Sequence, residues 1–229
     1  MQSKLILQLE TATTMCSVAL SADGELLALK ELNERNVHAS QITLFIDEVM
    51  KKAGKDYKEL DAIAVSKGPG SYTGLRIGVS TAKGLCFALD IPLISVNTLE
   101  AMASGFMQKY PNTGSASLLC PMIDARRMEV YTAIYDAKIT RIEPVSAKIL
   151  DEQTFDKYLE ENEVIVFGDG ASKSQSLYST HPNYRFEEFE NSAAHLSISA
   201  LRKFQSGQIE DLAYFEPFYL KDFIAGVSK

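Results

Sequence analysis

A glycine-rich run, KGPGSYTGLRIGVSTAKGL, opens a helical stretch at residues 67–85 and is the first candidate for chemistry in this chain. Such turns bind phosphate groups through free backbone N–H groups and the helix dipole. The phosphate-loop pattern is a glycine, four residues of any type, and then Gly-Lys-Ser/Thr. Here the residue five positions after Gly68 is Thr73 rather than glycine, and no lysine follows Gly74. The dinucleotide pattern fails because its third glycine comes one residue late, and Pro69 removes an N–H donor. The pattern therefore favours a strand-to-helix turn over a phosphate site.

Three acidic residues stand where an apolar strand ends, a place from which a carboxylate can position a metal ion. Glu10 follows the run LILQL, Asp124 follows LLCPMI, and Asp169 lies in the Gly-Asp-Gly step after VIVF. Glu10 and Asp124 align when the chain is laid over itself at a shift of half its length. Identity in that overlay is low, so an internal duplication and a chance match both stay open.

Two similar lobes, each with an acid at the end of its first strand, suggest the actin-like ATPase and sugar-kinase architecture. In that architecture, the hairpin after the first strand of each lobe clasps the nucleotide phosphates. Such hairpins need glycine, so that backbone N–H groups can reach the phosphate oxygens. This chain has Thr-Ala-Thr at residues 11–13 and Ala-Arg-Arg at 125–127. The nucleotide clasp is therefore predicted to be dismantled, and the paired arginines are interpreted as solvated charges rather than an anion site. A nucleotide-dependent ATPase or phosphotransferase that uses Glu10, Asp124 and Asp169 remains the alternative, and magnesium-dependent ATP turnover would support it.

The histidines and cysteines form no metal-binding or nucleophilic pattern. They are His38, His181, His195, Cys16, Cys86 and Cys120. No two histidines are three or four residues apart and no two cysteines form a CxxC pair, so a metallopeptidase is not supported unless stoichiometric zinc or iron is found. No G-x-S-x-G elbow is present and no cysteine stands beside an obvious base. We interpret the cysteines as reduced core thiols and His38 as a helix-capping or surface residue.

Composition limits the classes of protein to which this chain can belong. With 229 residues, 46% of them hydrophobic, the chain can form one large domain or two modest lobes. A formal net charge of −7 and a pI near 5.1 leave it without the basic surface that dominates nucleic-acid affinity, so any contact with nucleic acid should be indirect or local. No stretch reaches about 18 uncharged apolar residues, so we expect no membrane span, no export and a cytoplasmic location.

Hydrophobic periodicity predicts an α/β chain whose first half has the order βββαβαβ. The expected strands and helices, in chain order, are strands at 5–9, 16–20 and 26–29, a helix at 40–53, a strand at 62–65, a helix at 73–89, strands at 92–96, within 118–135 and at 164–167, and a helix at 193–204. We expect a duplicated actin-like, Hsp70-like and sugar-kinase-like fold of two lobes, each a mixed sheet with helices. The N-terminal lobe, residues 1–104, is predicted to form the partner contact, and residues 105–229 the C-terminal lobe. The aromatic cluster Phe215–Leu220 is interpreted as either core packing or a docking edge.

The helix at 73–89 is apolar nearly all round, so one flank can pack on the sheet while the other needs a second cover. Gly74, Gly78 and Ala82 share a face that another helix could approach closely. We predict a four-helix contact with a partner or a second copy of the chain, through these candidates: Gln41, Phe45, Tyr72, Gly74, Leu75, Arg76, Gly78, Val79, Ala82 and Lys83. A bulky acid at Gly78 should then weaken partner binding while the isolated chain still folds. The alternative is that this helix is simply buried within its own lobe.

Five stretches together resemble the bacterial TsaB family, also called YeaZ. They are KGPGSYTGLRIGVSTAKGL, LQLETATTMCSVAL, VNTLEAMA, DARRMEVYTAIY and EPFYLK. The resemblance covers nearly the whole chain, and the first run is the most specific. One departure is Glu10, where the family usually carries Asp; the change keeps the charge.

The resemblance implies a non-catalytic scaffold of the actin-like superfamily rather than an active glycoprotease. It implies pairing with TsaD, which transfers a threonylcarbamoyl group to the adenosine next to the anticodon of ANN-decoding tRNAs, and with TsaE, a small ATPase. The two metal-binding histidines of TsaD correspond to Thr98 and Met102 here, and neither side chain replaces imidazole on a metal. ATP and metal are therefore expected in TsaD and not in this chain, tRNA is expected to be reached only through the complex, and a homodimer is expected when TsaD is absent.

Overall fold

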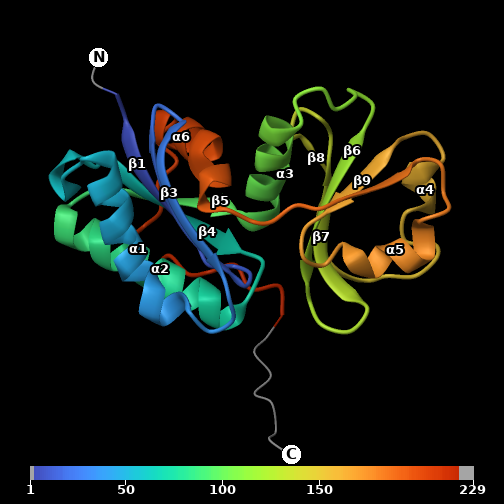
Figure 1. Cartoon of the computed structure of the whole chain (residues 1–229), viewed down its shortest axis with the longest axis horizontal. Helices are drawn as coiled ribbons and strands as arrows, with labels where there is room; N and C mark the ends of the chain where they lie inside the picture. The colour runs from blue at the N-terminus through green and yellow to red at the C-terminus, as the bar shows by residue number, and fades with distance from the viewer. Residues whose placement is uncertain (1–2, 222–229) are drawn as a thin grey trace, which may run out of the picture.

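The computed structural model describes residues 3–221, which form two lobes, each built on a five-stranded sheet (Figure 1). The first sheet has the strand order β3-β2-β1-β4-β5. Its strands are β1 (Leu5–Glu10), β2 (Met15–Ala22), β3 (Glu25–Asn33), β4 (Ala62–Gly68) and β5 (Leu93–Asn97). The first three form the predicted antiparallel meander, and β4 and β5 continue the sheet in parallel from β1.

The second sheet repeats this arrangement, with the order β10-β9-β6-β7-β8. Its strands are β6 (Leu118–Asp124), β7 (Glu129–Tyr135), β8 (Arg141–Ile149), β9 (Val164–Phe167) and β10 (Tyr184–Glu187). Here β6, β7 and β8 form the antiparallel meander, and β9 and β10 continue in parallel from β6. The two sheets have one topology when β1 is matched to β6, which confirms the duplicated α/β fold.

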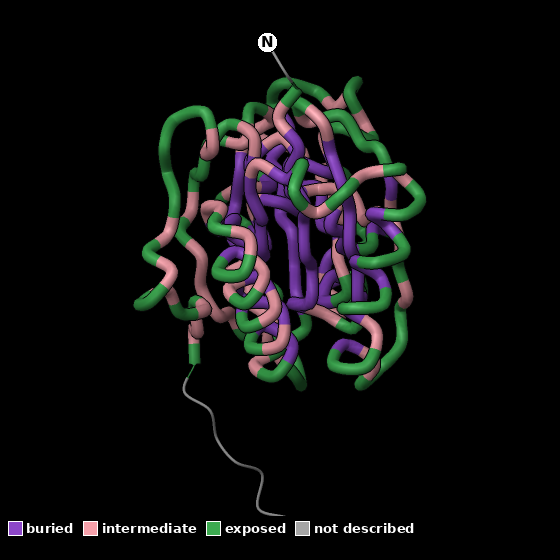
Figure 2. The backbone as a smooth tube through the Cα atoms, turned by 90° about the vertical axis from the view of Figure 1, so that its left-hand side faces the viewer, coloured by how far each residue is buried: buried purple, intermediate pink, exposed green. Residues whose placement is uncertain are grey.

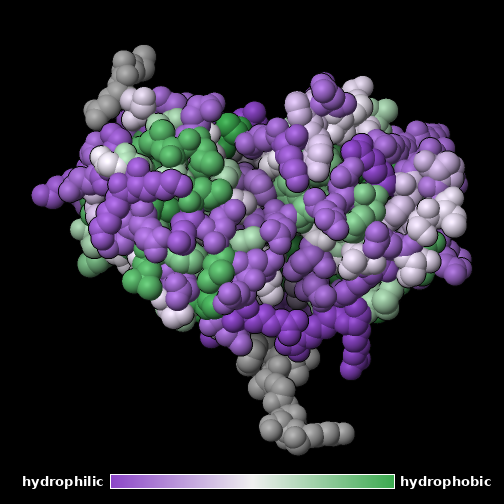
Figure 3. Space-filling model, viewed as in Figure 1, coloured by the Kyte–Doolittle hydropathy of each residue, from purple (hydrophilic) through white to green (hydrophobic). Residues whose placement is uncertain are grey.

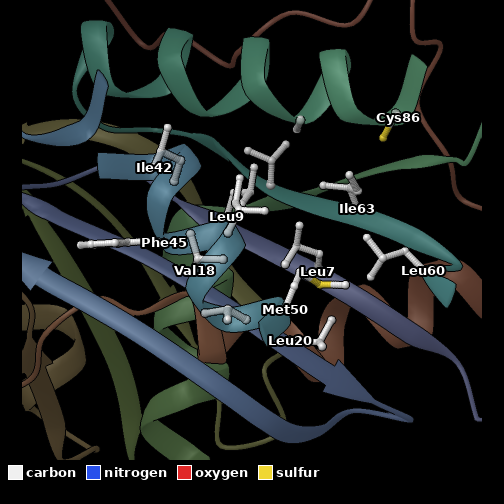
Figure 4. Close-up of a cluster of buried hydrophobic side chains, with 14 of the residues drawn as sticks. Leu7, Leu9, Val18, Leu20, Ile42, Phe45, Met50, Leu60, Ile63 and Cys86 are labelled. Carbon is white, nitrogen blue, oxygen red and sulfur yellow. The ribbon is translucent and has the colours of Figure 1, made fainter. Parts of the chain in front are cut away.

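Helices cover both faces of the sheets. They are α1 (His38–Ala53), α2 (Tyr72–Leu89), α3 (Thr98–Lys109), α4 (Asp156–Leu159), α5 (Ser172–Tyr178) and α6 (Ser197–Gln205), with 3-10 turns η1 (Tyr57–Glu59) and η2 (Ala193–Leu196). The inward side chains of β1 and β2 pack beneath α1 and α2 in one apolar cluster (Figure 4). The strands are buried at the centre of this lobe, and exposed residues lie on the outside (Figure 2). None of the helices within residues 3–221 is long and apolar enough to cross a membrane.

Two helices cross between the lobes. The helix α3 follows β5 of the first sheet, yet its side chains Leu99, Met102 and Phe106 pack on the second sheet. Conversely, η2 and α6 follow the second sheet, yet Leu196 and Ala200 pack on the first. The predicted boundary at residue 104 therefore falls inside α3, and the described residues after Asn191 do not belong to a separate C-terminal lobe, because their apolar surface is buried on the first sheet.

Candidate functional site

Glu10, the last residue of β1, is fully buried. One carboxylate oxygen accepts a hydrogen bond from the Ala12 backbone N–H at 2.6 Å, and the Ser66 hydroxyl donates to the other. Burial raises the pKa of this carboxyl group to about 7, although hydrogen bonds from Ser66, Ala12 and Asn191 oppose the shift. The acid is therefore enclosed by the chain rather than presented to a ligand.

Asp124, the last residue of β6, occupies the same place in the second lobe but lies near the surface. Its carboxylate accepts from the Arg126 N–H at 2.6 Å and pairs with the Lys173 ammonium group at 2.8 Å. Its backbone N–H donates to the Asp169 carboxylate at 3.0 Å. Partial burial works to raise the pKa of Asp124, but the hydrogen bond and charge of Lys173 outweigh it and lower the pKa below its ordinary value.

The two strand-end acids share one local role. Each accepts a hydrogen bond from the N–H of the residue two positions later, and so caps the turn that follows its strand. The structure brings Asp124 and Asp169 together and leaves Glu10 in the other lobe. Among residues 3–221, no group of three or more histidine, cysteine, aspartate or glutamate side chains has the arrangement of a metal site.

Sequence reasoning missed three residues that fix these acids. Ser66 precedes the glycine-rich turn on β4, Asn191 lies in the segment that returns to the first lobe, and Lys173 belongs to α5. No motif signalled Asn191 or Lys173. The hydroxyl of Ser66, in the otherwise apolar run of β4, was the one available hint of a buried polar partner.

The small-residue face of α2 is buried inside its own lobe. A Cβ atom added at Gly74 would lie 2.1 Å from the Thr11 carbonyl oxygen, and one at Gly78 would lie 2.3 Å from the Thr11 hydroxyl oxygen. The close approach is therefore that of the β1–β2 turn, because these glycines let it pack against the helix. Most of the proposed contact residues are likewise buried, namely Phe45, Gly74, Leu75, Gly78, Val79 and Ala82. The small-residue face of α2 therefore packs within its own lobe, and a bulky acid at Gly78 is incompatible with this packing.

The remaining candidates lie around the rim of α2. Gln41 is half-buried on α1. The guanidinium group of Arg76 lies 4.2 Å from the centre of the Tyr72 ring, and its Nε donates to the Tyr219 hydroxyl at 3.3 Å. The Lys83 ammonium group donates to two backbone carbonyls at 3.2 and 3.1 Å. These contacts fasten residues 210–221, here called the C-terminal strap, along α2.

The strap contains the aromatic cluster Phe215–Leu220, which the sequence assigned either to core packing or to a docking edge. The Phe218 N–H donates to the Lys67 carbonyl at 2.7 Å, and the ring of Tyr219 lies 4.6 Å from that of Tyr72. A Cβ added at Gly68 would lie 2.4 Å from the Phe218 carbonyl oxygen, so this glycine permits the strap to pass. The described part of the cluster thus packs against α2 and the end of β4.

The outward face of α2 has a different composition. Its exposed residues other than Arg76 are Thr73, Ser80, Gly84, Phe87 and Ala88, none of them charged. Phe87 is 82% exposed, and a Cβ added at Gly84 would meet nothing within 4 Å. Apolar side chains appear on the surface over α1 and α2, and a larger group lies near β3 and α6 (Figure 3).

Thr98 and Met102, the positions at which the resemblance places the metal-binding histidines of TsaD, have structural roles. Both residues are buried in α3, and the Met102 methyl group fills the space beside Gly168.

His195 is stacked on Phe189, and burial lowers its pKa to about 4. His38 is buried at the start of α1 with a ring nitrogen 3.3 Å from the Met15 carbonyl, so it is neither a surface residue nor the helix cap. The three cysteines are buried and free, as predicted.

The duplicated sheets and their crossing helices define a protein of the actin-like and sugar-kinase class, in which both strand-end acids serve the chain's own turns. Component A of (R)-2-hydroxyglutaryl-CoA dehydratase from Acidaminococcus fermentans shares this fold, with a TM-score of 0.54 over 91% of this chain and 100% of that chain, at 8% identity. At this identity the likeness extends to the fold alone.

The family model of TsaD, tRNA N6-adenosine threonylcarbamoyltransferase, matches residues 31–223. The chain is 40% identical over 131 residues to the tRNA threonylcarbamoyladenosine biosynthesis protein TsaB of Haemophilus influenzae, which covers 57% of this chain and 53% of that protein. The solved structure of YeaZ from Pseudomonas aeruginosa superposes with a TM-score of 0.76 at 25% identity, over 95% of this chain and 100% of that one. The chain therefore belongs to the TsaD family, and within it to the TsaB (YeaZ) branch, as its motifs predicted. It spans about half the length of the curated relatives that it matches.

Proposed function

We propose that this chain is a non-catalytic scaffold subunit in the biosynthesis of threonylcarbamoyladenosine in tRNA, where it pairs with a TsaD-type transferase. Family membership supports the pathway, because the matching family model and curated relatives carry that activity or process in their names. The absence of a catalytic role is supported by the state of the strand-end acids. Glu10 is enclosed by its own turn, and Asp124 is neutralised by the Lys173 ammonium group.

The observation that carries the pairing is the outward face of α2. A glycine in the middle of an exposed helix costs about 1 kcal/mol relative to alanine, and nothing within the described chain occupies the space beside Gly84. Ser80 and Ala88 stand one turn on either side of it, and Phe87 exposes an aromatic ring next to it. A close helix contact with a partner would explain both the small residues and the exposed ring.

This contact replaces the inner glycine face as the proposed partner surface. Tyr72, Arg76 and Lys83 form its rim on the strap side, and Gln41 lies on the neighbouring helix α1. The occupant is the equivalent pair of helices of TsaD or, without TsaD, of a second copy of this chain. A TsaE-type ATPase completes the assembly, ATP and metal belong to the TsaD partner, and tRNA is reached through the complex.

Reconstituted tRNA modification tests the scaffold role. TsaD, TsaE and the adenylate-forming enzyme are incubated with tRNA, with and without this chain, and threonylcarbamoyladenosine is measured by mass spectrometry. Modification only in its presence, with none from this chain alone, is the expected result. Equal modification without it would overturn the proposal and return attention to Glu10, Asp124 and Asp169 as groups with an activity of their own.

Substitution of Gly84 by tryptophan tests the surface. Since the space beside Gly84 is open and tryptophan has a higher helix propensity than glycine, the isolated variant should fold with unchanged circular dichroism and a thermal midpoint no lower than that of the wild type. Its affinity for TsaD, measured by calorimetry, should fall at least tenfold, as expected for a bulky side chain forced into a packed contact. Ser176→Trp, on the exposed side of α5 in the second lobe, is the matched control and should bind normally. Normal binding by Gly84→Trp would exclude this face.

A further inference from the structure

A cavity of about 200 Å³ lies between α2 and the C-terminal strap. Its lining includes Arg76, Ser80 and Lys83 from α2, and Phe215, Glu216 and Tyr219 from the strap. Since a water molecule takes about 30 Å³ in the liquid, the space holds a small ion together with part of its hydration shell. The cavity exists only because the strap lies along the helix.

Two cations line this cavity, and neither forms an ion pair with a carboxylate of residues 3–221. The ion pairs formed among residues 3–221 include neither Arg76 nor Lys83. Lys83 donates to the uncharged carbonyl groups of Ala213 and Phe215, and Arg76 donates through Nε to the Tyr219 hydroxyl. These neutral partners hold both side chains in place, and the Glu216 carboxylate on the same cavity wall offsets part of the Arg76 charge without forming an ion pair.

The orientation of Arg76 is fixed from two sides. Its guanidinium group lies over the Tyr72 ring, and its Nε is taken by Tyr219. A planar guanidinium group held in this way loses little rotational freedom when its remaining N–H groups bind an oxyanion. Ser80 adds a hydroxyl group to the same wall. The chain as a whole is acidic, so a cavity lined by two cations and one carboxylate is a local exception.

We propose that the cavity between α2 and the strap is a binding site for a small oxyanion, bound between Arg76 and Lys83 with Ser80 as an additional donor. Phosphate and carboxylate share the required chemistry: compact negative charge and several acceptor oxygens. Arg76, Ser80 and Lys83 also border the proposed partner surface, but the isolated chain contains all the groups of the site, so anion binding is measured without a partner. Glu216 also lines the cavity and opposes the anion, so it keeps the affinity low and makes the site reversible.

Titration of the isolated full chain tests the site. Inorganic phosphate and, separately, acetate are added at constant ionic strength, and backbone amide shifts are followed by NMR. We expect saturable shifts confined to residues 76–83 and 215–219, with a dissociation constant in the millimolar range, as for a small, partly exposed ion site. Saturation by phosphate alone identifies a phosphate-type ligand, and saturation by acetate as well identifies a general carboxylate or phosphate site. Shifts that do not saturate, or that are equally large at Arg126 and Arg127, would overturn the proposal.

Three variants and a control separate the site from general surface charge. Ser80→Asp places a carboxylate beside the cations and leaves the strap contacts in place, so it should abolish binding. Arg76→Gln should weaken it about tenfold, since a charge-assisted hydrogen bond is lost. Glu216→Gln should tighten it about threefold by removing a repulsive charge. Arg202→Gln, an exposed arginine of α6, should change nothing. Unchanged binding in Ser80→Asp would contradict the site even if Arg76→Gln proved to loosen the strap.

Discussion

The turn after β1 and the turn after β6 start from the same geometry and end in opposite environments. In both, a strand-end acid accepts the N–H of the residue two positions later. The first turn is then pressed against α2, whose glycines admit Thr11, so that Glu10 is buried and its pKa rises to about 7. The second turn stays open, Arg126 and Arg127 are exposed in left-handed conformations, and Lys173 holds the pKa of Asp124 below its ordinary value.

This difference distinguishes the features of the turn that both lobes share from the features that are particular to one lobe. The capping bond recurs in both lobes, so it belongs to the strand-turn-strand unit itself. Burial and charge do not recur, because they depend on the helix that packs over each turn. An acid at this position is therefore not by itself a sign of catalysis in this fold.

The largest expected effect comes from filling the space that lets α2 close over the first turn. Gly74→Ala should destabilise the chain by about 3 kcal/mol or more, because its Cβ would lie 2.1 Å from a backbone carbonyl oxygen, which cannot rotate away. Gly78→Ala should cost only about 1 kcal/mol, since its clash is with the Thr11 hydroxyl and the helix itself gains from alanine. Urea unfolding of the purified variants measures both.

A double substitution provides the control. Thr11→Ala removes the hydroxyl that Gly78→Ala would meet, and that hydroxyl has no hydrogen-bond partner among residues 3–221. The pair should therefore be more stable than Gly78→Ala alone, whereas Thr11→Ala should not rescue Gly74→Ala. Rescue of both variants, or of neither, would contradict this account of the first turn.

The next effect concerns the charge of Glu10 and appears as a dependence on pH. Because its pKa is about 7 in the folded chain and near 4.5 when unfolded, the folded chain binds the proton more tightly. The stability linked to this group is complete below pH 4.5 and is lost as pH rises to 7, a change of about 3 kcal/mol. Glu10→Gln cannot ionise, so its stability relative to the wild type should increase over this range.

Unfolding in urea at pH 5 and pH 8 checks this prediction. The difference between variant and wild type cancels the titration of all other groups, so Glu10→Gln should gain stability relative to the wild type at pH 8. A difference that stays constant across the two pH values would mean that Glu10 ionises normally and is not enclosed by the first turn.

Much of the fold follows from short-range pattern. The apolar run of β1, whose six residues are all buried, and the apolar stripe of α1 could both be predicted from the sequence. The strands β8 and β10 could not, because β8 is a half-exposed edge strand that contains Pro144 and β10 has only four residues. The local sequence pattern does not predict that α3 and α6 each pack on the sheet of the other lobe, because this packing depends on tertiary contacts.

The prediction of the functional site from the sequence was limited in a similar way. The spacing of Gly74 and Gly78 indicated a close approach by another helix, whereas in the structure Thr11, a residue distant in sequence, lies against both glycines. The prediction assigned the inner face of α2 to a partner because periodicity tells which residues share a face and not which face meets the sheet. Once the buried side is known, Gly84 stands out, since it is the α2 glycine that no internal contact requires.

The smallest expected effect belongs to the open turn. Asp124→Asn keeps an oxygen that can accept from the Arg126 N–H but loses the charge that pairs with Lys173. The Asp124 side chain is 46% exposed, so the pair should contribute less than about 1 kcal/mol at pH 7. Because the folded pKa is lowered below 3.8, this contribution is present above that pH and is lost as the pH falls below it. A double-mutant cycle with Lys173→Gln, in urea at pH 7 and pH 3, should give a small coupling at pH 7 and a smaller one at pH 3. A coupling of several kcal/mol would mean that this turn is as closed as the first, and that the contrast between the lobes is wrong.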